Sequence, residues 1–384
     1  MIVYVDNNAT TKIADEVFEA MKPFLTENYG NPSSMHTFGG KIKRFIEKAR
    51  ESVASLLGAE SPSEIIFTSC GTESDNTAIM STLRSFPNKK HIITTKVEHP
   101  AVLSLCKYLE TVGYRVSYLN VDSKGQLDLD ELVYSIQSDT ALISIMYANN
   151  ETGVIFPIQE IAEIARQKNI IFHTDAVQAL GKIPFGLKKI PVDLVSISGH
   201  KIHAPKGVGA LYIRKGTKFT PFILGGHQEE GRRGGTENVA SIIGFGVACE
   251  LAKKYMEDEN NRVKYLRDKL ENSILEKIPN TRVNGDRVNR LPNTTNISFE
   301  FVEGEAILLM LDQKGICASS GSACTSGSLT PSHVLKAMGV PFTFLQGSIR
   351  FSLSRYNTEE EINYIISVLP PIIERLREIS PYGK

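Results

Sequence analysis

Two residues of this 384-residue chain, Lys201 and Asp175, could together carry out chemistry on a carbonyl group. The segment 198–201, which ends at Lys201, directly follows the apolar run 192–197, and Asp175 ends the apolar run 170–174. Ligands of parallel sheets bind beyond the carboxyl ends of the strands, which is where both residues fall. A lysine there can form a Schiff base if its surroundings lower its pKa. Taken alone, however, Lys201 is typical of a solvated surface lysine, and Asp175 is as typical of a helix N-cap as of a ligand.

As a pair, the two residues are more specific. A pyridoxal phosphate site needs a lysine for the aldehyde and a carboxylate that keeps the pyridine nitrogen protonated. The segment 68–76 follows an apolar run and opens a helical pattern. The backbone N–H groups of Gly71 and Thr72, with the Thr72 hydroxyl, would therefore meet a phosphate at a helix N-terminus. An ordinary capped turn gives the same pattern. Only the presence of Lys201 and Asp175 in the same sequence favours a phosphate site.

One cysteine, Cys324, lies in the Gly/Ser-rich segment 319–330. A thiol on such a loop lacks the packing that makes a core cysteine inert, so it could carry a group into a site and out again. The other cysteines lie in expected strands, helices or their ends, and we interpret them as structural: Cys70, Cys106, Cys249 and Cys317. No CxxC pair and no matching histidine cluster occurs, so we expect no metal site.

Arg350 lies in the expected strand 348–353, where an inward-facing charge is expensive unless it is paired. A planar guanidinium can hold a carboxylate through two hydrogen bonds. The alternative is a surface arginine on an edge strand, and we expect nearby Arg355 to be one.

Composition narrows the class of protein. Lys+Arg and Asp+Glu number 43 each, which gives no overall attraction to nucleic acid or to an anionic membrane. The longest apolar runs, such as Ala306–Leu311, are far shorter than the ~20 residues that span a bilayer. The first eight residues do not resemble a signal peptide, and an odd number of cysteines does not form a disulfide framework. These features favour the reducing cytoplasm.

Short apolar runs alternate with helical patterns through the first two-thirds of the chain. The expected strands are 64–68, 91–95, 141–147, 170–174 and 192–197, and 158–168 is an expected helix. This alternation predicts an α/β fold with a mostly parallel sheet flanked by helices. Residues 240–277 predict one long helix or two nearly continuous ones, at a domain boundary. Beyond them, strands 295–301 and 348–353 with helices 303–313 and 359–378 predict a smaller α+β domain.

Nine motifs occur in order along the chain: DNNATT (6–11), TSCGTESDN (68–76), EHP (98–100), NNETG (149–153), HTDAVQ (173–178), SGHK (198–201), RRGGTEN (232–238), SSGSACTSG (319–327) and SIRFSLSRY (348–356). From end to end, the chain resembles the cysteine desulfurase family, the NifS- and IscS-like branch of the fold-type-I pyridoxal phosphate enzymes in the class-V aminotransferase superfamily. The resemblance implies an aspartate-aminotransferase-like fold. Its large domain would span residues 16–254, and its small domain residues 1–15 and 255–384, including the cysteine loop 319–330.

The resemblance also implies a role for each matching residue. Lys201 would hold pyridoxal 5′-phosphate, Asp175 would pair with the pyridinium nitrogen, and His99 would stack on the ring and shuttle protons. Asn150 and Gln178 would bond the phenolic oxygen and the nearby substrate. The phosphate ligands would be Gly71, Thr72, Ser198 and His200, with Thr236 supplied by the partner subunit of a homodimer. Arg350 would bind the substrate carboxylate.

The reaction implied is removal of sulfur from L-cysteine, which gives L-alanine and a persulfide on Cys324. The acceptor would be a protein such as an iron–sulfur scaffold. The alternatives are a selenocysteine lyase, a related aminotransferase that does not need Cys324, and a catalytically inactive binding module. A nicotinamide-dependent dehydrogenase is disfavoured because no GxGxxG follows the early strands. Two residues depart from the family pattern, since Cys70 and Ala204 stand where glycine is common.

Overall fold

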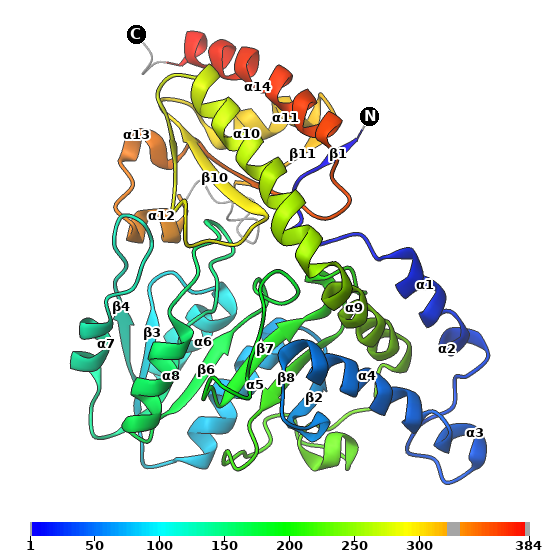
Figure 1. The fold of residues 1–384 in the computed structure, drawn as a ribbon. Coiled ribbons are helices and arrows are strands. Elements are labelled where there is room, and N and C mark those ends of the chain that lie inside the picture. The colour runs from blue at the N-terminus through cyan, green and yellow to red at the C-terminus, as the bar shows by residue number, and fades with distance from the viewer. Residues whose placement is uncertain (1, 321–330, 381–384) are drawn as a thin grey trace.

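The computed structural model of the chain describes residues 2–320 and 331–380 (Figure 1). The larger of its sheets has seven strands among these residues, in the order β2 (Ile65–Thr68), β8 (Gly209–Ile213), β7 (Leu194–Ser198), β6 (Ile171–Asp175), β5 (Thr140–Ser144), β3 (His91–Thr95) and β4 (Arg115–Leu119). From β7 to β4 every neighbouring pair is parallel, whereas β8 is antiparallel to both β7 and β2. The predicted mostly parallel sheet is thus confirmed, but the sequence pattern missed β4 and β8.

Helices flank this sheet, and α5 (Gly71–Ser85) packs across β5, β6, β7 and β8. The other helices of this part of the chain are α1 (Asp15–Met21), α2 (Pro23–Thr26), α3 (Thr37–Gly40), α4 (Lys43–Leu57), α6 (Pro100–Thr111), α7 (Leu129–Ser135) and α8 (Ile158–Gln167). Short 3₁₀ turns lie at η1 (Pro62–Glu64), η2 (Gly199–Lys201) and η3 (Gln228–Gly231). The strands at the centre of the sheet are buried at every residue except Ile171, the first of β6, as crossover connections with covering helices require.

A nearly continuous helix leads from the large sheet to the rest of the molecule (Figure 1). It consists of α9 (Val239–Asp258), one π-helical turn η4 (Glu259–Val263) and α10 (Lys264–Lys277). This agrees with the prediction of two nearly continuous helices. α9 packs on α4 and α1, and α10 packs on α14 (Glu359–Ile379).

A second, antiparallel sheet has the order β12 (Ser348–Ser352), β10 (Thr294–Phe299) and β9 (Thr281–Val283). A parallel pair, β1 (Val3–Tyr4) with β11 (Ile316–Cys317), lies beside it. The remaining helices are α11 (Gly304–Asp312), α12 (His333–Ala337) and α13 (Phe342–Leu345). Because β1 pairs with β11, the first residues of the chain pack with its C-terminal third.

The molecule has two main hydrophobic clusters, one around the seven-stranded sheet and one around the three-stranded sheet. The larger cluster surrounds the seven-stranded sheet, and the second contains Val3, Val5 and apolar residues from Val263 to Leu376. These clusters support our proposed division into residues 16–254 and residues 1–15 with 255–384. Three parts of the chain depart from it, because Ala14, Leu291 and the side chains from Val334 to Leu345 that belong to a core pack in the larger cluster.

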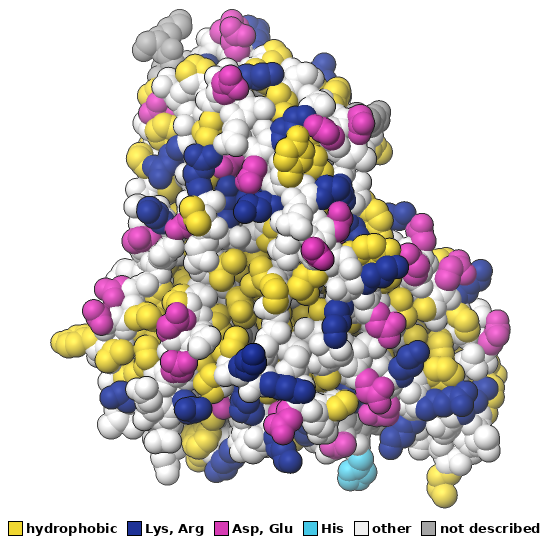
Figure 2. Space-filling model, viewed as in Figure 1, with side chains coloured by type: hydrophobic (Ala, Val, Ile, Leu, Met, Phe, Trp, Pro, Cys, Tyr) yellow, Lys and Arg dark blue, Asp and Glu magenta, His cyan; other side chains and the backbone are white. Residues whose placement is uncertain are grey.

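The charges are mixed over the molecular surface. Figure 2 shows basic and acidic side chains interspersed on the face that it draws, as the equal numbers of the two kinds suggest. None of the helices formed by the described residues combines the length and the apolar character that crossing a bilayer requires.

Candidate active site

A cavity of about 230 Å³ lies where the carboxyl ends of β6 and β7 meet the N-terminus of α5. Its walls include ten residues, nine of which the sequence analysis nominated: Gly71, Thr72, Asp75, His99, Asn150, Asp175, Gln178, Ser198, His200 and Lys201. Ala9, Cys70, Met146, Ala148 and Val177 complete the walls. Residues that are far apart in the sequence thus meet at the edge of the sheet where parallel α/β folds bind ligands.

Lys201 and Asp175 line the same cavity, as their positions after neighbouring strands predict. Lys201 lies in the short turn η2, and its Nζ donates to the carbonyl oxygens of Asn8 at 2.6 Å and Ala9 at 2.8 Å. The Asp175 Oδ1 accepts from the Val177 backbone N–H at 2.9 Å. The helix expected after Asp175 is absent, because residues 177–182 form turns instead. Asp175 therefore caps a turn and faces the cavity at once.

The electrostatics of Asp175 suit a cationic ligand. Burial raises the pKa of this carboxyl to about 6, against the opposing effects of the Val177 N–H and the charge of Lys201. A cation bound beside the carboxyl would favour its ionised form and relieve the cost of burying it.

The start of α5 fits a phosphate. The helix begins at Gly71 after the N-cap Cys70, whose Sγ accepts from the Glu73 N–H at 3.5 Å. A Cβ at Gly71 would come within 2.8 Å of the Val177 side chain, so this wall of the cavity needs a glycine. The Ser198 hydroxyl, which is buried, has no hydrogen-bond partner among the described residues. A buried hydroxyl without a partner beside a positive helix end is what an anionic ligand would satisfy.

Two histidines line the cavity in their neutral form. Burial, reinforced by the charge of Lys201, lowers the pKa of both His99 and His200 to about 4. The Nδ1 of His99 accepts from the Ala101 N–H at 3.1 Å, so its proton is on Nε2. His200 shares a hydrogen bond of 3.2 Å with the Thr10 hydroxyl.

Gln178 and Asn150 connect the cavity to the N-terminal segment. The Gln178 amide donates to the Asn8 carbonyl at 3.0 Å, the same oxygen that accepts from Lys201. The Asn150 carbonyl accepts from Arg350 Nη1 at 3.0 Å and from the Asn8 amide at 3.1 Å. The backbone around Asn8 is thus shared by several of the nominated side chains.

Arg350 does not line the cavity, but it is tied to it through Asn150. Its side chain is buried in β12, and its Nη2 bonds the Asp6 carboxylate at 2.6 Å. The pairing that the sequence analysis required of an inward-facing arginine is therefore present. Arg355, expected at the surface, is instead only 7% exposed and pairs with Glu259 at 3.4 Å. That expectation was wrong because its acidic partner lies in η4, far away in the sequence.

The remaining two nominated residues are not in the cavity. Thr236 is exposed, in the segment before α9, and does not line the cavity of its own chain. Cys324 lies outside the described residues. Of the other cysteines, Cys106 and Cys249 are buried, and burial raises the pKa of the Cys106 thiol to about 12. Their inertness agrees with the structural interpretation.

The described residues on either side of segment 321–330 bond to the site. The backbone of Ser319 pairs with that of Arg350 at 2.6 and 3.3 Å. The Ser332 hydroxyl donates to the buried Glu151 carboxylate at 2.5 Å, and a ring nitrogen of His333 lies 2.9 Å from the Glu98 carbonyl oxygen. The described residues before and after this segment are thus bonded to Arg350 and to the sequence neighbours of the cavity residues Asn150 and His99.

Sequence reasoning missed several residues that hold these groups. Asp6 and Asn8 belong to a motif quoted for the resemblance, yet neither was nominated. Their contacts use a backbone carbonyl and a distant arginine, which no local pattern reveals. Asp75, also missed, stands one helical turn after the nominated Gly71 and Thr72, and this spacing could have suggested it.

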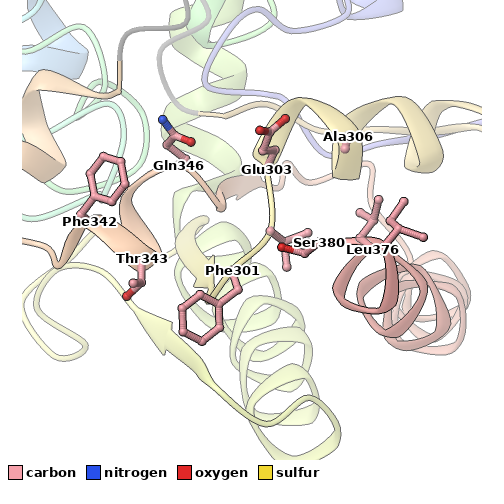
Figure 3. A pocket seen from close by; sticks show the side chains of 10 residues that line it. Phe301, Glu303, Ala306, Phe342, Thr343, Gln346, Leu376 and Ser380 are labelled. Atoms are coloured by element: carbon pink, nitrogen blue, oxygen red, sulfur yellow. The ribbon is translucent and has the colours of Figure 1, made fainter. Parts of the chain in front are cut away.

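A larger cavity, about 350 Å³, lies elsewhere, between α11, α13 and the end of α14 (Figure 3). Phe301, Phe342 and Leu376 are among its mostly apolar walls. The described residues that line it include no lysine–carboxylate pair and no buried donor without a partner. The smaller cavity is therefore the better candidate for the active site.

The α/β fold and a cavity with a lysine, a carboxylate and a helix N-terminus define a pyridoxal-phosphate type of site. Consistent with this, residues 3–365 match the model of the family "Aminotransferase class-V". The chain belongs to this family, whose members depend on pyridoxal phosphate.

Similarity over the full length narrows the group to the NifS-like cysteine desulfurases. The chain is 61% identical to "Cysteine desulfurase" of Nostoc sp., over 99% of this chain and 95% of that protein. It is 60% identical to "Cysteine desulfurase NifS" of Azotobacter vinelandii, over 99% and 94% of the two chains. A solved "NifS-like protein" superposes with a TM-score of 0.92 at 44% identity, over 98% of this chain and 100% of the other. The predicted family, fold and type of enzyme are confirmed.

Proposed function

We propose that this enzyme uses pyridoxal phosphate to take sulfur from L-cysteine and to hold it as a persulfide on Cys324, leaving L-alanine. The observation that carries the proposal is the cavity shared by Lys201 and Asp175. The bonds that fix both flanks of the Cys324 segment beside this cavity support it further.

The residues of the cavity fit the cofactor. Asp175 would hold the ring nitrogen, Lys201 would attach the aldehyde carbon, and His99 would cover the ring. Gln178 and Asn150 would face the phenolic oxygen. The phosphate would take the N-terminus of α5 with these ligands: Gly71, Thr72, Ser198 and His200. Once bound, pyridoxal phosphate supplies an electron sink that makes the Cα proton of the amino acid acidic.

The substrate would be bound by its carboxylate. Arg350 is fixed at one side by Asp6 and by the Asn150 carbonyl, so its guanidinium is held in one orientation before substrate arrives. Such preorganisation lowers the entropy that binding must lose. Arg350 would then hold the carboxylate of L-cysteine, with Asn150 beside it.

Protons would be moved by Lys201 and His99. Lys201 would accept the Cα proton, because its Nζ is held at the cavity by the carbonyl oxygens of Asn8 and Ala9. His99, neutral with its proton on Nε2, can donate that proton and take one back.

The sulfur would be received by Cys324. Its thiolate would attack the sulfur of the substrate, forming an S–S bond while the Cβ–S bond breaks. The electron pair of the broken bond passes to the carbon skeleton, which takes up protons and leaves as L-alanine. Because the thiolate is the nucleophile, the reaction rate should fall as the pH is lowered below the pKa of this thiol, which is nominally about 8.5.

Substitution of the cysteine tests the proposal. Cys324→Ala should bind pyridoxal phosphate and L-cysteine, with the accompanying changes of colour, but should release no alanine. In the wild-type enzyme, mass spectrometry after incubation with L-cysteine should find one added sulfur on the peptide that contains Cys324. Wild-type rates of alanine release by Cys324→Ala would remove this cysteine from the mechanism, and formation of keto acid would indicate an aminotransferase.

The assembly is part of the same proposal. Thr236 is exposed and does not line the cavity of its own chain, which supports its delivery to the phosphate of a partner subunit in a homodimer. A sulfur-acceptor protein such as an iron–sulfur scaffold would take the persulfide sulfur. The free thiol that the proposal assigns to Cys324 is preserved where cysteines are kept reduced, which supports a cytoplasmic enzyme.

A further inference from the structure

A second carboxyl group, that of Asp75, lies in the wall of the cavity beside Asp175. Asp75 belongs to the first turns of α5 and is 1% exposed. Its Oδ1 has no hydrogen-bond partner among the described residues. The proposed function gives this buried carboxyl no role, although it shares the cavity with the group that would hold the ring nitrogen.

Asp75 stands at the end of a chain of buried polar groups. The ring of His173 bonds the hydroxyl of Ser144 through Nδ1 at 2.9 Å and that of Ser196 through Nε2 at 2.8 Å. The same Nε2 lies 3.6 Å from the Asp75 Oδ1, and the Ser196 hydroxyl is within reach of the Asp75 carboxyl. Burial lowers the pKa of His173 to about 3, so this histidine is neutral and gives Asp75 no cationic partner.

The groups that face Asp75 disfavour a negative charge on it. Burial, followed by the charge of Asp175, raises its pKa well above the usual range, and the Ser196 hydroxyl only partly opposes this. Glu98 and Cys70 act in the same direction when they are ionised. Two carboxyl groups in one buried cavity cannot both ionise cheaply. Lys201 and the Val177 N–H favour the charge on Asp175, and neither acts on Asp75.

A proton on Asp75 also completes the hydrogen bonds of the chain. The Asp75 hydroxyl can donate to Ser196, the Ser196 hydroxyl to Nε2 of His173, and Nδ1–H of His173 to Ser144. An ionised Asp75 would instead leave a buried charged oxygen without a donor, which is expensive.

We propose that Asp75 is a positioning residue that keeps its proton, so that Asp175 alone presents a negative charge to the ring nitrogen of the cofactor. The proposal rests on the proposed function for the identity of that cofactor. The two neighbouring aspartates, Asp75 and Asp175, thus differ in protonation. One is an anion that binds the ring, and the other is a neutral acid that fixes the site's total charge.

Matched amide substitutions test this difference. Asp75→Asn replaces a neutral acid by a neutral isostere, so the apoprotein should bind pyridoxal phosphate within about threefold of the wild type. Asp175→Asn removes the anion, and binding should weaken on the order of a hundredfold. The absorbance maximum of the loaded Asp75→Asn protein should match the wild type from about pH 6 to about pH 9. Equal loss of affinity in both variants would overturn the proposal.

A measurement on the wild-type holoenzyme covers the case in which a variant does not fold. With the aspartate carboxyl carbons labelled with carbon-13, one carboxyl signal should remain in its protonated position at neutral pH. If every aspartate carboxyl is ionised there, Asp75 does not keep its proton and the inference fails. Failure of the wild-type chain to bind pyridoxal phosphate would instead refute the proposed function, while the same labelled apoprotein still tests the proton on Asp75.

Discussion

At the scale of single residues, burial decides the charge of the site more than pairing does. The carboxyl of Glu98 shows this next to the cavity. Its Oε1 accepts from the Thr95 hydroxyl at 2.8 Å and from the Met146 N–H at 3.0 Å. Burial nevertheless outweighs these bonds and raises its pKa to about 8. Glu98 is therefore a neutral acid under ordinary conditions.

The raised pKa of Glu98 predicts a pH-dependent stability. A carboxyl whose pKa is higher in the folded protein stabilises the fold at low pH, and this contribution is lost as pH rises from about 4.5 to about 8. Glu98→Gln cannot ionise, so it does not lose this contribution. The free energy of unfolding of the variant should therefore increase relative to that of the wild type as the pH rises across this window. The expected gain is a few kcal/mol, at about 1.4 kcal/mol per pKa unit.

Urea denaturation of the apoprotein at several pH values between about 5 and about 9 would measure this gain. Glu374→Gln, at an exposed position of α14, is the matched control and should follow the wild type throughout. A constant difference between Glu98→Gln and the wild type at all pH values would contradict the prediction.

At the scale of elements, helix caps and strand ends place the chemistry. α5 begins at the cavity, His99 is the N-cap of α6, and Ser332, close in sequence to Cys324, is the N-cap of α12. Ser332 accepts from the Leu335 N–H at 3.2 Å and also bonds Glu151. It is thus both a cap and an anchor to the site.

Removal of this cap should affect stability and sulfur transfer together. Ser332→Ala should lower the free energy of unfolding by about 1 kcal/mol or more, since it also leaves the buried Glu151 without its donor. Thr358→Ala removes the N-cap of α14, whose hydroxyl accepts from Glu361 N–H, and should cost about the same for the cap alone. Only Ser332→Ala should slow persulfide formation at Cys324, measured by mass spectrometry over time. Equal rates in the two variants would show that the anchor has no part in the transfer.

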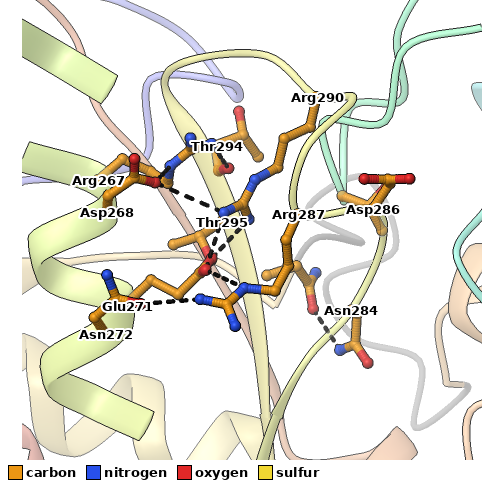
Figure 4. A network of polar contacts seen from close by, with 12 residues as sticks. Arg267, Asp268, Glu271, Asn272, Asn284, Asp286, Arg287, Arg290, Thr294 and Thr295 are labelled. Carbon is orange, nitrogen blue, oxygen red and sulfur yellow. Dashed lines mark hydrogen bonds and ion pairs between the residues drawn. The ribbon is translucent and has the colours of Figure 1, made fainter. Parts of the chain in front are cut away.

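At the scale of the whole molecule, a largely buried polar network ties α10 to β10 and to the loop between β9 and β10 (Figure 4). Glu271 of α10 accepts from Arg290 at 2.6 and 2.9 Å, from Arg287 at 2.9 Å and from Thr295 at 2.6 Å. The loop that carries these arginines bonds the turn next to Asn150, because Leu291 N–H donates to the Gly153 carbonyl at 2.8 Å. The network therefore connects α10 to the wall of the cavity.

Breaking this network should be far more costly than breaking a surface pair. Glu271→Gln leaves the buried Arg290 without its close counter-ion, and we expect a loss of about 3–5 kcal/mol in the free energy of unfolding. Asp139→Asn breaks the ion pair with Arg115, whose side chain is 57% exposed, and should cost at most about 1 kcal/mol. Urea denaturation measures both, and similar losses would contradict the assignment of the network as a structural link.

The sequence predicted those parts of the molecule that local patterns encode. Lys201 and Asp175 could be found because each ends a buried strand of a parallel sheet. The strand β8, by contrast, is a short antiparallel addition that starts at Gly209, and no helix separates it from β7. The pairing of Arg355 with Glu259 joins residues 96 positions apart and could not be read from either neighbourhood.

The edge of the small sheet gives one more consequence. Ser319 exchanges backbone hydrogen bonds with Arg350, so the strand that orients the guanidinium is also bonded to the chain just before the segment of Cys324, the sulfur carrier in our proposal. A slip of β12 by one residue would turn Arg350 away and shift the root of that segment in the same movement. A change in the orientation of Arg350 is therefore accompanied by a change in the position of Ser319. We expect substitutions along β12 to alter substrate affinity and sulfur transfer together.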